Sequence, residues 1–274
     1  MRTHNHKKTI WRSIVSGFLA AALVLTTCAA TFAPLSALAD ADTSKRFISQ
    51  YDSLAQMYNA EAKINVEVAA EGMVLLKNRD NALPLSRSAN VTLLGAASYN
   101  LYQGRNGTPG DGSAKVELAD SLEAVGISVN PRVQALYAQV GEGKLMDLVA
   151  SDGEVEFDGK SYVAASNGML DDAINTFKFY DDAAIITLRR TGDEGADNLA
   201  YNVPGHSDPS DHNLMLTDAE RETIAFAKQH FNKVIVLLNI PSMMEIGALK
   251  DDDAISAIVQ ISLPGSNGAA AIGK

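Results

Sequence analysis

The residues best suited to chemistry lie in a short acidic segment that follows an apolar run. Residues 183–188 are aliphatic or β-branched, which predicts a buried strand, and the segment 189–197 follows with the sequence Arg-Arg-Thr-Gly-Asp-Glu-Gly-Ala-Asp. In α/β folds, ligands bind outside the carboxyl ends of the strands. Glu194 has a glycine within two residues on either side, so the backbone can turn sharply there and a second surface can approach closely. Glu194 is therefore the candidate catalytic carboxylate.

Three neighbours of Glu194 are candidates for substrate binding or for orienting this loop. Arg189 and Arg190 either pair with Glu194 or Asp197, or they cap the end of the strand. Asp197 is better suited to tie down the loop through backbone hydrogen bonds than to react. The alternative interpretation is a solvated surface loop, which is the usual state of a loop carboxylate in an acidic protein.

Two further polar segments are weaker candidates. The glycine-rich segment 104–112 has neither the spacing of a P-loop nor a G-x-G-x-x-G fingerprint, so it predicts a surface loop or the rim of a substrate site. His206, Asp208, Asp211 and His212 offer donors for a divalent cation, but their spacing fits no helix-based ligand pair, which favours a solvated or rim loop. We predict no metal and no cofactor.

Composition limits the class of protein. The chain has 274 residues, of which 46% are hydrophobic and 20% charged, as expected for one large or two small globular domains. The formal net charge of −10 argues against nucleic acid or an anionic membrane as a partner. The single cysteine, Cys28, lies near the N-terminus, so the rest of the chain has no disulfide and no cysteine nucleophile.

The N-terminal segment predicts export. A basic start is followed by an apolar, Ala- and Leu-rich run at 14–32 and by Ala-Leu-Ala at 37–39, which is typical of a signal peptide over residues 1–39. Cleavage before Asp40 would give a secreted or cell-surface protein. The alternative is an uncleaved membrane anchor, because the apolar run is close to the roughly 20 residues that span a bilayer. A lipoprotein at Cys28 is disfavoured by the threonine before it.

The remaining sequence alternates between helix and strand patterns. Residues 40–60 form a linker and the start of a leading helix within 51–77, and 151–165 form a small hairpin insertion. The alternation predicts an α/β fold with a doubly wound, mostly parallel sheet sandwiched by helices. We expect strands at 91–94, 127–129, 183–188, 234–238 and 257–261, and helices at 116–125, 132–140, 171–180 and 218–231.

The last residues predict a domain that continues beyond the sequence given. A turn at 264–268 leads into a helix at 269–272 that is too short to hold itself together. We therefore expect a final helix and strand to be missing after Lys274, with one sheet edge unpaired. The strands at 234–238 and 257–261 would then be covered incompletely.

Several of these segments together resemble one family. Residues 69–78, Ala-Ala-Glu-Gly-Met-Val-Leu-Leu-Lys-Asn, followed by Leu-Pro-Leu at 83–85, resemble the start of the α/β-sandwich domain of glycoside hydrolase family 3. Residues 190–197 are similar to the acid/base loop of that family, and residues 233–239 to its late strand. The resemblance assigns residues 61–274 to this domain, truncated at its C-terminus.

The resemblance implies a mechanism. In that family the sandwich domain supplies the general acid/base, at the position of Glu194 here, and a (β/α)₈ barrel supplies an Asp nucleophile. The implied activity is β-glucosidase-like, retaining hydrolysis of O-glycosyl bonds in β-linked oligosaccharides or glucosides, which needs two carboxyl groups about 5–5.5 Å apart. The signal segment leads directly into the sandwich, as in permuted members in which the barrel follows, and the sequence given contains no barrel.

Two expectations follow from this comparison. The fragment alone is expected to be inactive. Asp193 stands where glycine is commoner in the family, and its charge would raise the pKa of Glu194.

The alternative function is a non-catalytic exported module that binds carbohydrate or docks a separate barrel domain.

Overall fold

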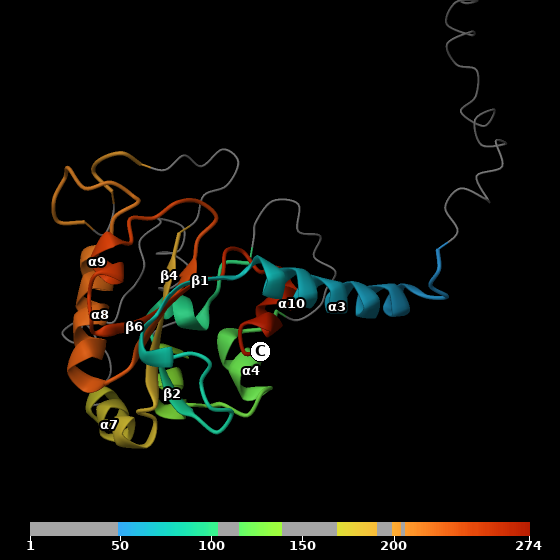
Figure 1. Ribbon diagram of the computed structural model, residues 1–274, viewed down its shortest axis with the longest axis horizontal. Helices are drawn as coiled ribbons and strands as arrows, with labels where there is room; N and C mark the ends of the chain where they lie inside the picture. The colour runs from blue at the N-terminus through green and yellow to red at the C-terminus, as the bar shows by residue number, and fades with distance from the viewer. Residues whose placement is uncertain (1–48, 104–114, 139–168, 191–198, 204–205) are drawn as a thin grey trace, which may run out of the picture. The chain divides into compact units, whose positions relative to one another are not determined.

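The computed structural model describes residues 49–103, 115–138, 169–190, 199–203 and 206–274 (Figure 1). The chain divides into two compact units, residues 1–56 and 57–274, and the second contains the whole sheet. The predictions for the signal segment, the glycine-rich segment 104–112 and the hairpin at 151–165 lie outside the described residues. The same holds for the Glu194 loop.

Six strands form one mixed sheet in the order β1-β6-β5-β4-β2-β3. All neighbours are parallel except β1 and β6, which pair antiparallel at one edge. This arrangement confirms the predicted α/β fold with a mostly parallel sheet. The strands are β1 (Val74–Asn78), β2 (Asn90–Leu94), β3 (Ser128–Val129), β4 (Ala183–Arg189), β5 (Val234–Asn239) and β6 (Ile255–Gln260).

Helices surround this sheet (Figure 1). Helix α8 (Asp218–His230), which follows β4 in the chain, begins with the predicted capping box. The Thr217 hydroxyl accepts a hydrogen bond from the backbone N–H of Glu220, and the Glu220 carboxylate accepts one from the backbone N–H of Thr217. The α-helices are α3 (Leu54–Gly72), α4 (Leu118–Glu123), residues 131–138, α7 (Met169–Thr176), α8 (Asp218–His230), α9 (Gly247–Lys250) and α10 (Gly265–Gly268). Single 3₁₀ turns are η2 (Arg79–Asn81), η3 (Ala96–Tyr99), η4 (Phe177–Phe179) and η5 (Ala269–Ala271).

The two faces of the sheet have separate apolar cores. On one face, α7, α8, α9 and residues 131–138 pack on alternate side chains of the central strands, such as Ile186 and Leu238. On the other face, α4 and the segment around η5 pack on the intervening side chains, such as Ile185 and Leu237. Because β4 and β5 have both faces within these cores, all their residues are buried, which explains their near-continuous aliphatic sequences. None of the helices within the described ranges is long and apolar enough to cross a membrane.

The prediction of helix through residue 77, as one long helix or two adjoining ones, is wrong after Gly72. Helix α3 ends at Gly72, and Val74–Asn78 form β1, which pairs with β6. Three consecutive aliphatic residues suit a strand as well as a helix face, and the backbone hydrogen bonds offered by β6 decide between the two. This pairing also corrects the expected open edge beside the last strand, since β6 has a neighbour on both sides.

Asp252 connects three elements near this edge of the sheet. Its carboxylate accepts hydrogen bonds from Lys228 of α8 and from the backbone of Ala254, and its carbonyl oxygen accepts one from Lys77 of β1 at 2.7 Å. The hydrogen bond from Lys228, followed by that from Ala254, lowers the pKa of Asp252 below its usual value of 3.8. A carboxyl group whose folded-state pKa is lowered stabilises the fold above its unfolded pKa, and this contribution is lost as the pH falls through the folded pKa.

Replacing this carboxylate should therefore have a pH-dependent effect. We expect Asp252→Asn to lower the free energy of unfolding at pH 7 by up to about 1 kcal/mol, because the ion pair is partly exposed. The difference from the wild type should shrink as the pH falls below 3.8. Urea unfolding between pH 7 and pH 2.5 measures it. Asp251→Asn, in a more exposed pair with Lys250, is the control and should change stability by less than about 0.5 kcal/mol. A difference for Asp252→Asn that does not vary with pH would contradict this role.

Candidate functional site

The candidate site lies at the carboxyl end of β4, where the segment that contains Glu194 begins. Strand β4 is central, between β5 and β2, and the segment leaves it after Arg189. Glu194 and Asp197 lie outside the described residues, so the structure describes the two arginines at the start of the segment and the elements that hold them.

Arg190 is buried and bonded through all three guanidinium nitrogens. Its Nε donates to the carbonyl oxygen of Asn213 at 3.0 Å, and Nη2 donates to that of Met215 at 2.8 Å. Its two terminal nitrogens bond both carboxylate oxygens of Glu220, at 2.5 and 2.7 Å. Bidentate Arg–carboxylate pairs fix orientation as well as charge. The start of the candidate loop is therefore bound to the segment that precedes α8.

Glu220 has two roles in this arrangement. Besides pairing with Arg190, its Oε2 accepts the backbone N–H of Thr217 at 2.9 Å, as the third residue of the capping box. Its side chain is 1% exposed and that of Arg190 4%, so both charges are out of solvent. The sequence analysis identified Glu220 only as a capping residue. A buried acidic side chain beside a buried arginine cannot be recognised from local sequence, because the two lie 30 residues apart.

Asn239 joins the loops on either side of the candidate site. It ends β5 opposite Arg189 of β4 and is fully buried. Its side-chain oxygen accepts the N–H of Tyr102 at 2.6 Å, and its nitrogen donates to the carbonyl oxygens of Tyr102 and Ser262 at 2.9 and 2.6 Å. Sequence reasoning missed it, although a polar residue that ends an otherwise aliphatic strand was the available signal.

Arg189 has the second cationic side chain at this edge. It is 7% exposed, and its Nη1 donates to the carbonyl oxygen of Asn100 at 3.0 Å. Arg189, Arg190 and Asn239 thus bind backbone carbonyl groups of several segments at the carboxyl ends of β4 and β5. This edge is therefore held in a defined arrangement by buried polar groups, and it lies where ligands bind in open α/β sheets.

The two histidines of the polar segment after residue 205 make separate contacts. His206 Nδ1 lies 3.2 Å from Asp211 Oδ2 and its side chain is fully buried, whereas residues 207–210 are exposed, as a solvated or rim loop would be. His212 Nε2 lies 3.3 Å from Glu245 Oε1. Asp208 accepts hydrogen bonds from the hydroxyl and the backbone N–H of Ser210. Both lower the pKa of Asp208, and the bond from the hydroxyl has the larger effect. Within the described ranges, no group of three or more His, Cys, Asp or Glu is placed to hold a metal ion.

Fold and edge together define an α/β domain with buried polar groups at the carboxyl ends of its central strands, and comparison with known proteins identifies its family. Residues 73–274 match the glycosyl hydrolase family 3 C-terminal domain, and the chain belongs to this family. It is 27% identical over 237 residues to β-glucosidase A of Butyrivibrio fibrisolvens, covering 77% of this chain and 26% of that protein. It is 26% identical over 213 residues to a β-glucosidase of Ruminococcus albus, covering 75% and 21%. The chain thus spans about a quarter of the length of these curated relatives.

Solved structures show the same fold. A β-glucosidase from Paenibacillus barengoltzii superposes with a TM-score of 0.60 at 24% identity, over 77% of this chain and 22% of that one. β-Glucosidase 3B from Thermotoga neapolitana, in complex with α-D-glucose, superposes with a TM-score of 0.60 at 21% identity, over 78% and 28%. The fold predicted from the sequence is thereby confirmed as that of the family 3 C-terminal domain.

We expect a large loss of stability when one charge of the buried Arg190–Glu220 pair is removed. Glu220→Gln keeps the size of the side chain and its capping capacity but removes the buried negative charge that Glu220 presents to Arg190. We expect it to lower the free energy of unfolding by about 3 kcal/mol, as for other buried pairs that lose one partner. Lys250→Gln breaks an exposed pair and should cost less than about 1 kcal/mol. Urea denaturation of the wild type and the two variants measures the free energies of unfolding. Equal losses of stability in Glu220→Gln and Lys250→Gln would show that the buried pair stabilises the fold no more than the exposed pair does.

Proposed function

We propose that this chain supplies the general acid/base for retaining, β-glucosidase-like hydrolysis of O-glycosyl bonds. In this proposal Glu194 is the catalytic residue, and a (β/α)₈ barrel domain outside this chain supplies the nucleophilic carboxylate. The substrate is a β-linked oligosaccharide or glucoside that binds between the two domains. Residues 1–274 alone are then expected to be inactive, because one of the two required carboxyl groups is missing.

The anchoring of Arg190 is the single observation that carries this proposal furthest. A general acid must be held within hydrogen-bond reach of the leaving oxygen, so the loop that bears it needs a fixed starting point. The bonds of Arg190 to Glu220, Asn213 and Met215 provide such a point four residues before Glu194. Family membership and the G-E-G-x-D-like sequence of the following segment support the same assignment.

In this proposal Glu194 is an acid that is protonated near neutral pH. Closure of a sugar site against the barrel would remove water from the carboxyl group and raise its pKa. The adjacent Asp193 would act in the same direction by repulsion between like charges. Arg189, Arg190 and Asp197 orient the loop in this proposal, and no cofactor takes part.

The test is made in the two-domain enzyme, in which this domain is joined to its barrel. Glu194→Ala should slow hydrolysis of glucosides with poor leaving groups, such as cellobiose, by about 10²–10⁴-fold. An aryl glucoside with a nitrophenolate leaving group should be slowed far less at its first step, since that group needs little protonation. Added azide should accelerate the variant by intercepting the glycosyl-enzyme, because a small anion needs no general base. Steady-state and burst kinetics with both substrates measure these effects.

Asp193→Asn is the matched control at the neighbouring position. It should keep the preference of the wild type among leaving groups and show no rescue by azide. Equal loss for both substrates in Glu194→Ala, without azide rescue, would make Glu194 a structural residue. Turnover by residues 1–274 alone that persists in Glu194→Gln would overturn the two-domain mechanism as well.

We further propose that the protein is exported and cleaved before Asp40. The support is the basic start, the apolar run and the Ala-Leu-Ala that precedes this position. Expression in a bacterial host, followed by N-terminal sequencing of the protein outside the cytoplasm, tests it. A mature N-terminus at Asp40 is expected, and Ala39→Leu should block processing because the site requires a small residue. An unprocessed protein in the membrane fraction would favour the anchor.

A further inference from the structure

Both ends of the segment that contains Glu194 are bonded to one residue, Asn213. The described chain stops at Arg190 before this segment and resumes at Leu199 after it. The carbonyl oxygen of Asn213 accepts a hydrogen bond from Nε of Arg190 at 3.0 Å, and its backbone N–H donates to the carbonyl oxygen of Leu199 at 3.1 Å. Asn213 therefore closes the base of the segment 191–198.

Asn213 lies in a tight turn that is itself fixed to the ends of β4 and β5. The N–H of Met215 donates to the carbonyl oxygen of His212 at 2.9 Å and closes the turn. The carbonyl oxygen of Met215 accepts a second nitrogen of Arg190 at 2.8 Å, and that of Leu214 accepts the N–H of Glu245, in the loop after β5, at 2.8 Å. Because these carbonyl groups are bound from two sides, a shift of the turn would break several hydrogen bonds at once.

The side chain of Asn213 is a buried amide at the base of this segment. Asn213 is 6% exposed, whereas His212 and Leu214 on either side of it are only partly buried. A buried amide offers two donors and an acceptor, and leaving them without partners costs free energy. Such a side chain therefore resists any rearrangement of the groups around it.

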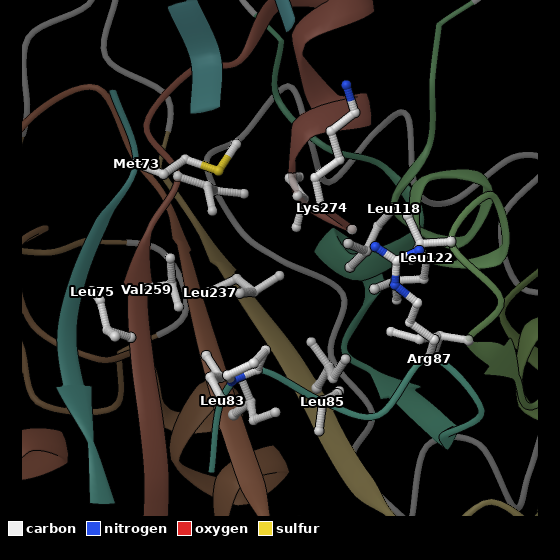
Figure 2. A pocket seen from close by; sticks show the side chains of 18 residues that line it. Met73, Leu75, Leu83, Leu85, Arg87, Leu118, Leu122, Leu237, Val259 and Lys274 are labelled. Atoms are coloured by element: carbon white, nitrogen blue, oxygen red, sulfur yellow. The ribbon is translucent and has the colours of Figure 1, made fainter. Parts of the chain in front are cut away.

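The apolar cavity on the face covered by α4 offers no group of this kind (Figure 2). It is lined by aliphatic side chains such as Leu83, Leu237 and Val259, and no acidic side chain lines it in the described part of the chain. Leu237 of β5 is buried there and Val259 of β6 only partly, so the expected incomplete cover applies to β6 and not to β5. Groups that position a catalytic carboxyl group are therefore sought at the strand ends.

We propose that Asn213 is a positioning residue for the general acid, an inference that rests on the function proposed for Glu194. Arg190 and Glu220 fix where the segment 191–198 begins, and Asn213 fixes in addition where it returns. Joining the two ends at one buried turn restricts the conformations of the segment between them. A misplacement of a catalytic group by about 1 Å costs on the order of 10²-fold in rate, so this restriction bears directly on proton transfer.

The first test is Asn213→Ala in the two-domain enzyme, with two substrates. The substitution removes the amide and keeps the backbone groups that bind Arg190 and Leu199. We expect kcat/KM for cellobiose to fall by about tenfold or more, because its leaving group needs a well-placed acid. The value for the nitrophenyl glucoside should stay within about twofold, since its leaving group needs little protonation.

Asn130→Ala is the matched control, because it removes a second buried amide at a different place. Asn130 is fully buried and donates to Thr92 of β2 and Thr176 of α7. Thr92 pairs with Ala184 at the start of β4, at the end of that strand away from the candidate site. Asn130→Ala should lower stability in urea unfolding but change kcat/KM for both substrates by the same factor. Circular dichroism at the assay temperature confirms that both variants are folded.

A double-mutant cycle distinguishes positioning from a general loss of structure. If Asn213 acts through Glu194, adding Asn213→Ala to Glu194→Ala should change the rate with cellobiose by less than about twofold. A tenfold loss that persists in the double variant would make Asn213 a structural residue and overturn the inference. A leaving-group effect in Glu194→Ala but not in Asn213→Ala would overturn the inference alone. Its absence from both variants would overturn the function proposed for Glu194 as well.

Discussion

The buried pair between Arg190 and Glu220 is the interaction on which the arrangement of the candidate site depends. It connects the end of the central strand β4 to the first turn of α8, and its charges are satisfied by each other and by backbone groups. Two charges in a dry interior add little net stability compared with an apolar pair of the same size. Their effect is to make alternative positions of the strand end costly, because any shift separates two opposite charges that are both buried.

The direction of the strands explains why the polar residues gather at one edge. Strands β2, β4, β5 and β6 run parallel, so their carboxyl ends lie together, and helices cover both faces of β4 and β5. In β4 and β5, charged and amide side chains stand only at the last residue of each strand. Arg189 and Asn239, opposite each other at the ends of β4 and β5, occupy this place and bind the carbonyl groups of Asn100 and Tyr102.

Features that depend on local sequence were predictable. The aliphatic runs of β4 and β5 and the capping box of α8 contain their structural signal within a few residues. Features that depend on distant partners were not. Val74–Asn78 forms a strand because β6 offers it a pairing edge about 180 residues away, and the aliphatic sequence alone suits either state.

The same limit applies to the candidate site. The sequence motif assigns Glu194, and its neighbouring arginines were recognised as supporting residues. What holds these arginines could not be foreseen, since Glu220 is indistinguishable from any capping glutamate until β4 and α8 meet. Asn239 likewise acquires its role only when the segments containing Tyr102 and Ser262 converge on it. Local pattern thus identifies the reactive group, whereas tertiary structure identifies the groups that position it.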